Sequence, residues 1–220
     1  LNGDGLDDIA IGPRASADHA AYVVFGRDDG FPSLMNLDLS LATYGFAFSF
    51  DRPPLFYKEV SVVIAGDLNG DGIDDLAVSQ GSGVITGSSR QPVVHVIYGR
   101  AGTPFPVELH ADDLDGTQGF TLVGTPGTSG TNAYTRAAGD VNGDGVDDLL
   151  VGLPGASPLG RVDAGQIAVV YGRTDGSFEA VELLPHTAGG NGFLIYGEEP
   201  FAYLGFLRRM SRAGDVNVDG

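Results

Sequence analysis

The feature of this sequence that most restricts its fold is an internal repeat of about 73 residues. Acidic loops begin at Asp67, Asp140 and Asp215, which lie 73 and 75 positions apart. Nearly the same step separates three further sets of landmarks: Phe25-Gly26-Arg27, Tyr98-Gly99-Arg100 and Tyr171-Gly172-Arg173; Phe31, Phe105 and Phe178; Gly45-Phe46, Gly119-Phe120 and Gly192-Phe193. Such a period indicates an array of similar units, each of which buries its apolar faces against its neighbours.

Each repeat contains four short runs that predict β-strands. In the middle repeat they are Val60–Ala65, Leu76-Ala77-Val78, Val93–Tyr98 and Phe120–Val123. These runs are almost continuously apolar, as expected for sheets covered on both faces. We therefore predict an all-β fold of β-propeller blades, each with four antiparallel strands. A β-sandwich is the alternative, but it requires no 73-residue period.

The repeat boundaries divide the chain into four parts. Residues 1–56 form a blade with strands two to four and without its first strand, and residues 57–132 and 133–203 form one blade each. Residues 204–220 supply the first strand, expected within Leu204–Ala213, and a partial loop of the next blade. The 220 residues therefore hold about three blades. The recurring Phe31, Phe105 and Phe178 are expected to fill the core beneath the long third loop of each blade.

Composition excludes several classes of protein. The chain has no cysteine, which removes disulfides, thiolate metal sites and cysteine catalysis. Its formal net charge of −17 repels nucleic acid and anionic membranes, because both are polyanions. No apolar run approaches the roughly 20 residues that span a bilayer, so membrane insertion is not expected.

The acidic loops have the spacing of a calcium site. Oxygen-bearing side chains occupy positions 1, 3 and 5, glycine occupies position 6, and a carboxylate follows at position 9. Ca²⁺ takes six to eight oxygen ligands, including backbone carbonyls such as that of position 7. Asp-Gly and Asn-Gly turns also occur in ordinary hairpins, but hairpin turns do not explain four loops with one oxygen spacing. The predicted ligands of the two complete loops are Asp67, Asn69, Asp71, Ile73 (carbonyl) and Asp75, and Asp140, Asn142, Asp144, Val146 (carbonyl) and Asp148.

Two further loops are incomplete. The first retains Asn2, Asp4, Leu6 (carbonyl) and Asp8 but no acid at position 1, and the last has Asp215, Asn217 and Asp219 without the closing acid. We expect these 220 residues to be a window on a longer protein, with calcium bound weakly in the first loop. Asp74 and Asp147, at position 8 of their loops, are expected to be solvated or to support the ligands.

The loop and its flanks resemble the FG-GAP repeat of integrin alpha chains. Ala65-Gly66-Asp67 and Ala138-Gly139-Asp140 lead into the loops, Asp-Leu-Ala-Val and Asp-Leu-Leu-Val follow them, and Gly152–Ala156 is a loose Gly-Ala-Pro motif. The segment from Val23 to Pro32 looks like the version found in large secreted bacterial proteins. The resemblance implies a seven-bladed calcium-binding propeller that serves adhesion or recognition, in some cases beside an enzyme domain.

No catalytic constellation is visible. The histidines at positions 19, 95, 110 and 186 show neither metal spacing nor a fixed place in the repeat, and no nucleophile motif is present. His95 is expected to be a packed or edge residue of a strand rather than a catalyst. Arg27, Arg100 and Arg173 either pair with nearby acids such as Asp28 and Asp175, which we favour, or form a ring of anion contacts.

Two functional hypotheses follow. The first is a calcium-stabilised, non-enzymatic propeller region of a secreted or cell-surface protein, acting in adhesion, recognition or surface assembly. Its partner would be an extracellular protein, a glycan or copies of itself. The second is an accessory domain of a large secreted hydrolase whose catalytic residues lie outside this chain. The sequence flanking these residues would discriminate between the two.

Overall fold

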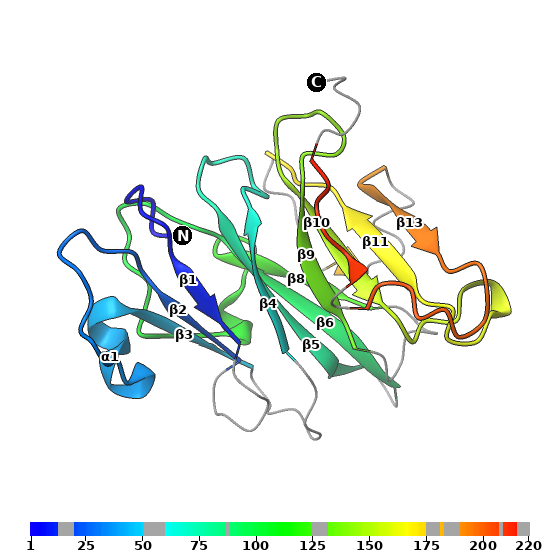
Figure 1. Cartoon of the computed structure of the whole chain (residues 1–220), viewed down its shortest axis with the longest axis horizontal. Coiled ribbons are helices and arrows are strands. Elements are labelled where there is room, and N and C mark those ends of the chain that lie inside the picture. Colours follow the sequence, from blue (N-terminus) through cyan, green and yellow to red (C-terminus); the bar gives the residue numbers. More distant parts are fainter. Residues whose placement is uncertain are drawn as a thin grey trace.

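Three β-sheets stand side by side in the computed structural model of the chain (Figure 1). The structure describes residues 1–12, 20–50, 60–86, 89–124, 132–174, 181–182, 190–206 and 209–214. Sheet one contains β1 (Ile9–Ile11), β2 (Ala21–Val24), β3 (Gly45–Ser49) and β7 (Glu108–His110). Sheet two contains β4 (Val60–Gly66), β5 (Asp75–Thr86), β6 (Ser89–Ile97), β8 (Gly119–Val123) and β12 (Val181–Glu182). Sheet three contains β9 (Tyr134–Gly139), β10 (Asp148–Leu153), β11 (Gln166–Val170) and β13 (Gly192–Tyr196).

Consecutive strands of each repeat pair antiparallel, which confirms the predicted blade architecture. In sheet three, β9 pairs with β10, β10 with β11 and β11 with β13. The same order recurs in β4, β5, β6 and β8 of sheet two. Sheet two packs against a neighbouring sheet on each face, and near-continuous apolar strands are what such a doubly covered sheet requires.

The apolar core lies between the sheets. One cluster joins sheets one and two through side chains such as Val23, Phe46 and Ile97. A second joins sheets two and three and includes Val96 and Leu149. Where β4 faces β9, the buried Ser61 hydroxyl takes part in hydrogen bonds with Thr135, which satisfies polar groups between two blades.

Two strands come from the long loops and were not predicted. β7 pairs parallel with β3, and β12 pairs parallel with β8, so each loop adds a strand to the sheet of the preceding repeat. The loop of the first repeat instead contains the helix α1 (Leu37–Tyr44). Two 3₁₀ turns complete the regular structure, η1 (Ala111–Asp113) and η2 (Pro158–Gly160).

Further sequence-based predictions concern the burial of individual aromatic and histidine side chains. Phe105 stacks on Phe46 with ring centroids 4.4 Å apart, as expected of a core residue. Phe31 is 46% exposed, so its predicted core position is wrong, and Phe178 lies outside the described residues. His95 is buried as predicted, with Nδ1 3.0 Å from the Thr121 hydroxyl.

The strand expected within Leu204–Ala213 does not form in the described part of that segment. Leu204 makes only an isolated bridge to Gly165, and residues 209–214 contain no strand. The first strand of a blade is held by the second strand of the same blade, as β9 is held by β10. In the described residues, no second strand pairs with this segment.

Candidate metal centre

The acidic loops 1–8, 67–75 and 140–148 lie along one edge of the array, at the top of Figure 1. Each of the two complete loops connects the first strand of a blade to the second, because it follows β4 or β9 and leads into β5 or β10. The first loop likewise leads into β1. Asp215, Asn217 and Asp219 of the last loop lie outside the described residues.

In the second loop, the side chains at positions 1, 3 and 5 fold the backbone around themselves. Asp67 Oδ1 accepts the amides of Gly70 and Asp71 at 2.7 and 3.0 Å, and its Oδ2 accepts Gly72 at 2.8 Å. Asn69 Oδ1 accepts the Asp71 amide at 3.0 Å. Asp71 Oδ1 accepts the amide of position 7, Ile73, at 2.9 Å. The three side chains are therefore turned toward the interior of one tight loop.

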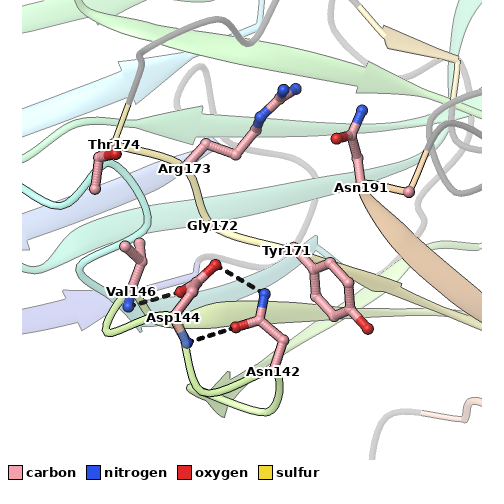
Figure 2. Close-up of a pocket in the computed structure, with 9 residues that line it drawn as sticks. Asn142, Asp144, Val146, Tyr171, Gly172, Arg173, Thr174 and Asn191 are labelled. Carbon is pink, nitrogen blue, oxygen red and sulfur yellow. Dashed lines mark hydrogen bonds between the residues drawn. The ribbon is translucent and has the colours of Figure 1, made fainter.

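The third loop repeats this geometry. Asp140 accepts the amides of Gly143 and Gly145 at 2.7 and 2.8 Å. Asn142 and Asp144 are hydrogen-bonded to each other, as Asn69 and Asp71 are in the second loop. Asp144 Oδ1 accepts the Val146 amide at 2.9 Å (Figure 2). A cavity of about 280 Å³ adjoins these side chains. The shared pattern shows that the spacing read from the sequence specifies one backbone conformation.

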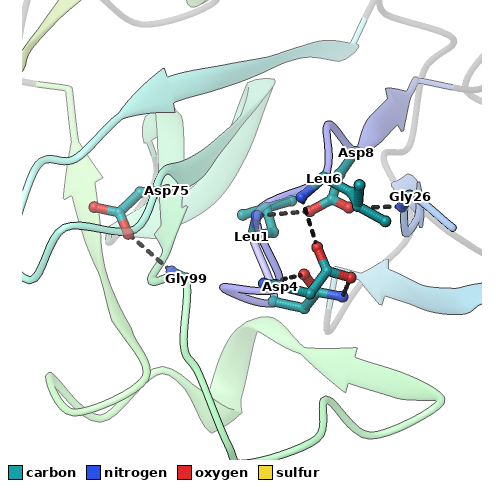
Figure 3. Close-up of polar contacts among 8 residues, drawn as sticks. Leu1, Asp4, Leu6, Asp8, Gly26, Asp75 and Gly99 are labelled. Atoms are coloured by element: carbon teal, nitrogen blue, oxygen red, sulfur yellow. Dashed lines mark hydrogen bonds and ion pairs between the residues drawn. The ribbon is translucent and has the colours of Figure 1, made fainter. Parts of the chain in front are cut away.

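The first loop keeps the same contacts at positions 3 and 5. Asn2 Oδ1 accepts the Asp4 amide at 3.2 Å. Asp4 Oδ1 accepts the Leu6 amide at 2.9 Å (Figure 3). The Leu1 ammonium contacts Asp8 Oδ2 at 2.6 Å. This contact matches the ones that the amides of Leu68 and Val141 make in the complete loops.

The closing acids at position 9 have a role that the sequence did not reveal. Asp75 is fully buried, and its two oxygens accept the amides of Leu68 at 2.9 Å and Gly99 at 2.8 Å. Asp148 likewise accepts the amides of Val141 and Gly172, at 2.8 and 2.9 Å. Each closing acid therefore ties its own loop to the end of the third strand of the same blade.

The recurring Gly-Arg pair extends this tie to the preceding blade. The amides of Arg100 and Arg173 each donate at 2.8 Å to the carbonyl at position 2 of the preceding loop, Leu1 and Leu68 respectively. A Cβ on Gly99 would lie 2.4 Å from the Asp74 carbonyl oxygen, so the backbone passes too close for any side chain. The period in the sequence thus reflects a period of contacts between blades.

Asp147 also joins two blades and is not simply solvated. Its amide donates to the Asp67 carbonyl at 2.9 Å, and its carboxylate accepts the Asp67 amide at 3.1 Å. Asp74 is exposed. Asp74 and Asp147 both occupy position 8 of their loops. Their surroundings differ because of the way in which the blades pack.

The pKa values of the two closing acids are raised by burial and by the other carboxylates of their loops. The pKa of Asp75 is raised to about 8, chiefly by burial and to a lesser extent by the nearby Asp71 and Asp67, while the hydrogen bonds from the Gly99 and Leu68 amides act in the opposite direction. Burial likewise raises the pKa of Asp148 to about 6, with Asp144 and Asp140 adding to the effect. A cation in either loop would offset this repulsion and favour the ionised carboxylates.

The donor sets fit a hard cation in their chemistry, since every predicted ligand atom is an oxygen. Within the described ranges, however, no group of three or more acidic or histidine side chains is already arranged to hold a metal. The oxygens of the closing acids accept hydrogen bonds from backbone amides. The other predicted side-chain ligands of each complete loop accept hydrogen bonds from amide groups of the same loop. Ligation would therefore add to these contacts or exchange some of them.

The recurring arginines do not share one role. Arg27 pairs with Asp29, with 2.6 Å between Nε and Oδ1, so a nearby acid is its partner as favoured, although not the Asp28 named as an example. The Arg100 guanidinium lies 4.1 Å from the Phe105 ring centroid and donates to the Gln118 side chain at 3.2 Å. Asp175 lies outside the described residues.

Comparison with known proteins agrees with this architecture. The FG-GAP repeat family profile matches residues 60–90 and 132–170. Phosphatidylinositol-glycan-specific phospholipase D from Bos taurus is 30% identical over 219 residues, covering 94% of this chain and 23% of that protein. The Rattus norvegicus form is 27% identical, with the same coverage. Integrin alpha-V from Gallus gallus is 27% identical over 187 residues, covering 83% of this chain and 14% of that protein.

The fold and the repeated loops thus define a chain of β-propeller blades. More specifically, it contains FG-GAP repeats and is integrin-like. It spans less than a quarter of the length of each of these relatives. All three are vertebrate proteins, and they give no support to the bacterial type expected from the sequence. In the described residues, no helix has the length and apolar character needed to cross a bilayer.

Proposed function

We propose that the chain is a calcium-stabilised propeller region of a secreted or cell-surface protein. The observation that carries this proposal is the identical folding of two loops 73 residues apart around the same Asp, Asn and Asp oxygens. Bound Ca²⁺ would supply positive charge near each closing acid, whose pKa the other carboxylates of its loop help to raise. A fold that needed only tight turns would not require this concentration of acid.

In the second loop the ion would be held by Asp67, Asn69, Asp71, the Ile73 carbonyl and Asp75. In the third it would be held by Asp140, Asn142, Asp144, the Val146 carbonyl and Asp148. Asn2, Asp4, the Leu6 carbonyl and Asp8 would form a weaker site, because position 1 has no acid. The loop containing Asp215, Asn217 and Asp219 has the same spacing but no closing acid.

Calorimetric titration of the chelator-treated chain with Ca²⁺ tests the assignment. We expect saturable binding, a melting temperature that rises with Ca²⁺, and a much weaker response to Mg²⁺, which demands smaller octahedral sites. Asp71→Asn and Asp144→Asn should each remove one of the stronger binding events. Asp74→Asn makes the same charge change outside the predicted ligands and should leave both events in place. A melting temperature that Ca²⁺ and chelator leave unchanged would refute the proposal.

The role of the region would be recognition rather than catalysis. Its acidic charge disfavours nucleic acid, the sequence offers no nucleophile with a base, and the chain is similar to integrin alpha-V. The partner would be an extracellular protein, a glycan or further copies of the chain. Arrays of glycans and of extracellular matrix proteins, probed with and without Ca²⁺, test this role. We expect binding that a chelator reverses, and turnover of substrate by the isolated chain would contradict the non-enzymatic assignment.

The similarity to phosphatidylinositol-glycan-specific phospholipase D favours a second candidate, an accessory propeller within a larger hydrolase. The aligned region covers only 23% of that phospholipase, so the rest of the enzyme lies outside the match. The sequence flanking these 220 residues in their gene decides between the candidates. A hydrolase domain there supports the accessory role, and further repeats with no enzyme domain support recognition alone.

A further inference from the structure

The last strand of each repeat has an outer edge, and two of these edges carry an added strand. β3 receives β7 and β8 receives β12, both in parallel orientation. In each case the added strand comes from the long third loop of the following repeat. The two additions therefore share their origin and orientation. Their registers differ by two residues, because Leu109 lies opposite Phe48, whereas Val181 lies opposite Leu122, the repeat counterpart of Phe48. The register of β7 is the one used below.

The added strands share a sequence pattern. Val107-Glu108-Leu109 and Val181-Glu182-Leu183 lie 74 residues apart, and a phenylalanine precedes each: Phe105 with one residue between it and the valine, and Phe178 with two. In the first case the Ala47 amide donates to the Val107 carbonyl at 2.9 Å, and Leu109 is 1% exposed. Phe105 stacks on Phe46 next to this strand. The segment thus contributes a backbone ladder, a buried leucine and an aromatic stack.

β13 occupies the same place in the third repeat and differs from β3 and β8. It pairs with β11 on one edge, and no described strand pairs with its other edge. Phe193 and Ile195 are 43% and 42% exposed. Their counterparts Phe46 and Phe48 in β3 are fully buried, and those in β8 are at most 2% exposed. Apolar side chains and a backbone edge are therefore left open together.

We propose that the outer edge of β13 is a docking site for an extended partner strand with a Phe-x-Val-Glu-Leu pattern. The partner would pair in parallel, with its glutamate opposite Leu194 and its leucine opposite Ile195, as Glu108 and Leu109 lie opposite Ala47 and Phe48. Its phenylalanine would stack on Phe193. The Leu194 amide, at the repeat position of the Ala47 amide, would donate to the partner.

The same geometry argues against self-pairing of two β13 edges. Two copies related by a two-fold axis would place these strands antiparallel, whereas both observed additions are parallel. The formal charge of −17 on each copy also opposes association of identical surfaces. A strand from a chemically matched segment therefore fits this edge better than a second copy does.

The test is titration of the isotopically labelled 220-residue chain, with Ca²⁺ present, with a synthetic peptide of residues 103–112. We expect saturable NMR shift changes centred on residues 192–196. Leu194→Pro removes the outward amide, which edge strands tolerate, and should weaken peptide binding at least about ten-fold. Leu194→Ala is the matched control, because it shortens the side chain but keeps the amide, and it should bind nearly as well as the parent chain.

Three outcomes would overturn the proposal: no saturable shift changes, shift changes centred elsewhere, or equal loss of binding in both Leu194 variants. Sedimentation without peptide is the further check, and self-association abolished by Leu194→Pro would assign the edge to a second copy instead. If Leu194→Pro does not fold, a peptide methylated at the Leu109 amide tests the ladder from the partner's side. That peptide must then bind at least about ten-fold more weakly than the unmodified one.

Discussion

Replacing Asp75 with asparagine tests whether a closing acid stabilises the fold by tying its acidic loop to the third strand of the same blade. In the structure, the two oxygens of this fully buried carboxylate accept one amide each, from Leu68 and Gly99. Asparagine has nearly the same shape but offers only one oxygen, so its NH₂ group must face one of these amides. One hydrogen bond is lost and one buried donor is left without an acceptor.

The expected magnitude follows from that count. A buried polar group without its partner costs about 1–3 kcal/mol, so we expect Asp75→Asn to lower the free energy of unfolding by about 2 kcal/mol. For a chain of this size, about 2 kcal/mol corresponds to a fall in melting temperature of roughly 4–8 °C. In Ca²⁺ the gap should widen, because the variant also loses a predicted ligand.

The assay is thermal unfolding followed by circular dichroism, in chelator and in Ca²⁺, at about pH 9, because Asp75 is ionised only above its pKa of about 8. Asp74→Asn is the control, since it makes the same charge change at an exposed neighbouring position and should shift stability by no more than about 0.5 kcal/mol. A melting temperature for Asp75→Asn within about 1 °C of the parent chain would refute the role assigned to this carboxylate. An equal shift in both variants would show that the loop responds to net charge alone.

Two further changes probe other parts of the array. Gly99→Ala places a Cβ 2.4 Å from the Asp74 carbonyl oxygen, so denaturant unfolding should show a loss of about 1–3 kcal/mol, and an unchanged midpoint would contradict the close approach. Burial lowers the pKa of His95 to about 4, so between pH 6.5 and 4 the unfolded chain binds a proton that the folded chain excludes, and stability falls as pH falls. Relative to His95→Asn, the parent chain should lose on the order of 3 kcal/mol across that window, and parallel stability curves for the two chains would refute this assignment.

The sequence by itself determined the features that depend on local pattern. Period and apolar runs located the blade strands, and for β8 the predicted Phe120–Val123 nearly equals the observed Gly119–Val123. The end of β5 was missed, because this strand continues from the predicted Val78 to Thr86. The spacing of Asp67, Asn69 and Asp71 specified the loop conformation, because short polar side chains bond to amides only two to five residues away. Because both partners of each of these hydrogen bonds lie in one short segment, the sequence of that segment is enough to predict them.

Tertiary structure decided everything that joins one blade to the next. The strand β7 has three residues, too few to show a period, and it exists because the edge of β3 is available to it. The expected core position of Phe31 failed where that of Phe105 held, although both occupy the same place in the repeat. Phe105 stacks on Phe46 with ring centroids 4.4 Å apart, whereas Phe31 meets the Tyr44 ring in a tilted arrangement at 6.5 Å and stays 46% exposed.

The closing acids show the same division within a single residue. Asp75 could be identified from its spacing as an acid at the mouth of a strand. Its bond to Gly99 spans 24 residues, and only the folded sheet brings the two together. The adjacent Arg100 amide reaches the Leu1 carbonyl of another blade. The spacing of residues in the sequence determines which hydrogen-bonding groups a loop can present. The packing of neighbouring sheets determines the partners to which those groups bond.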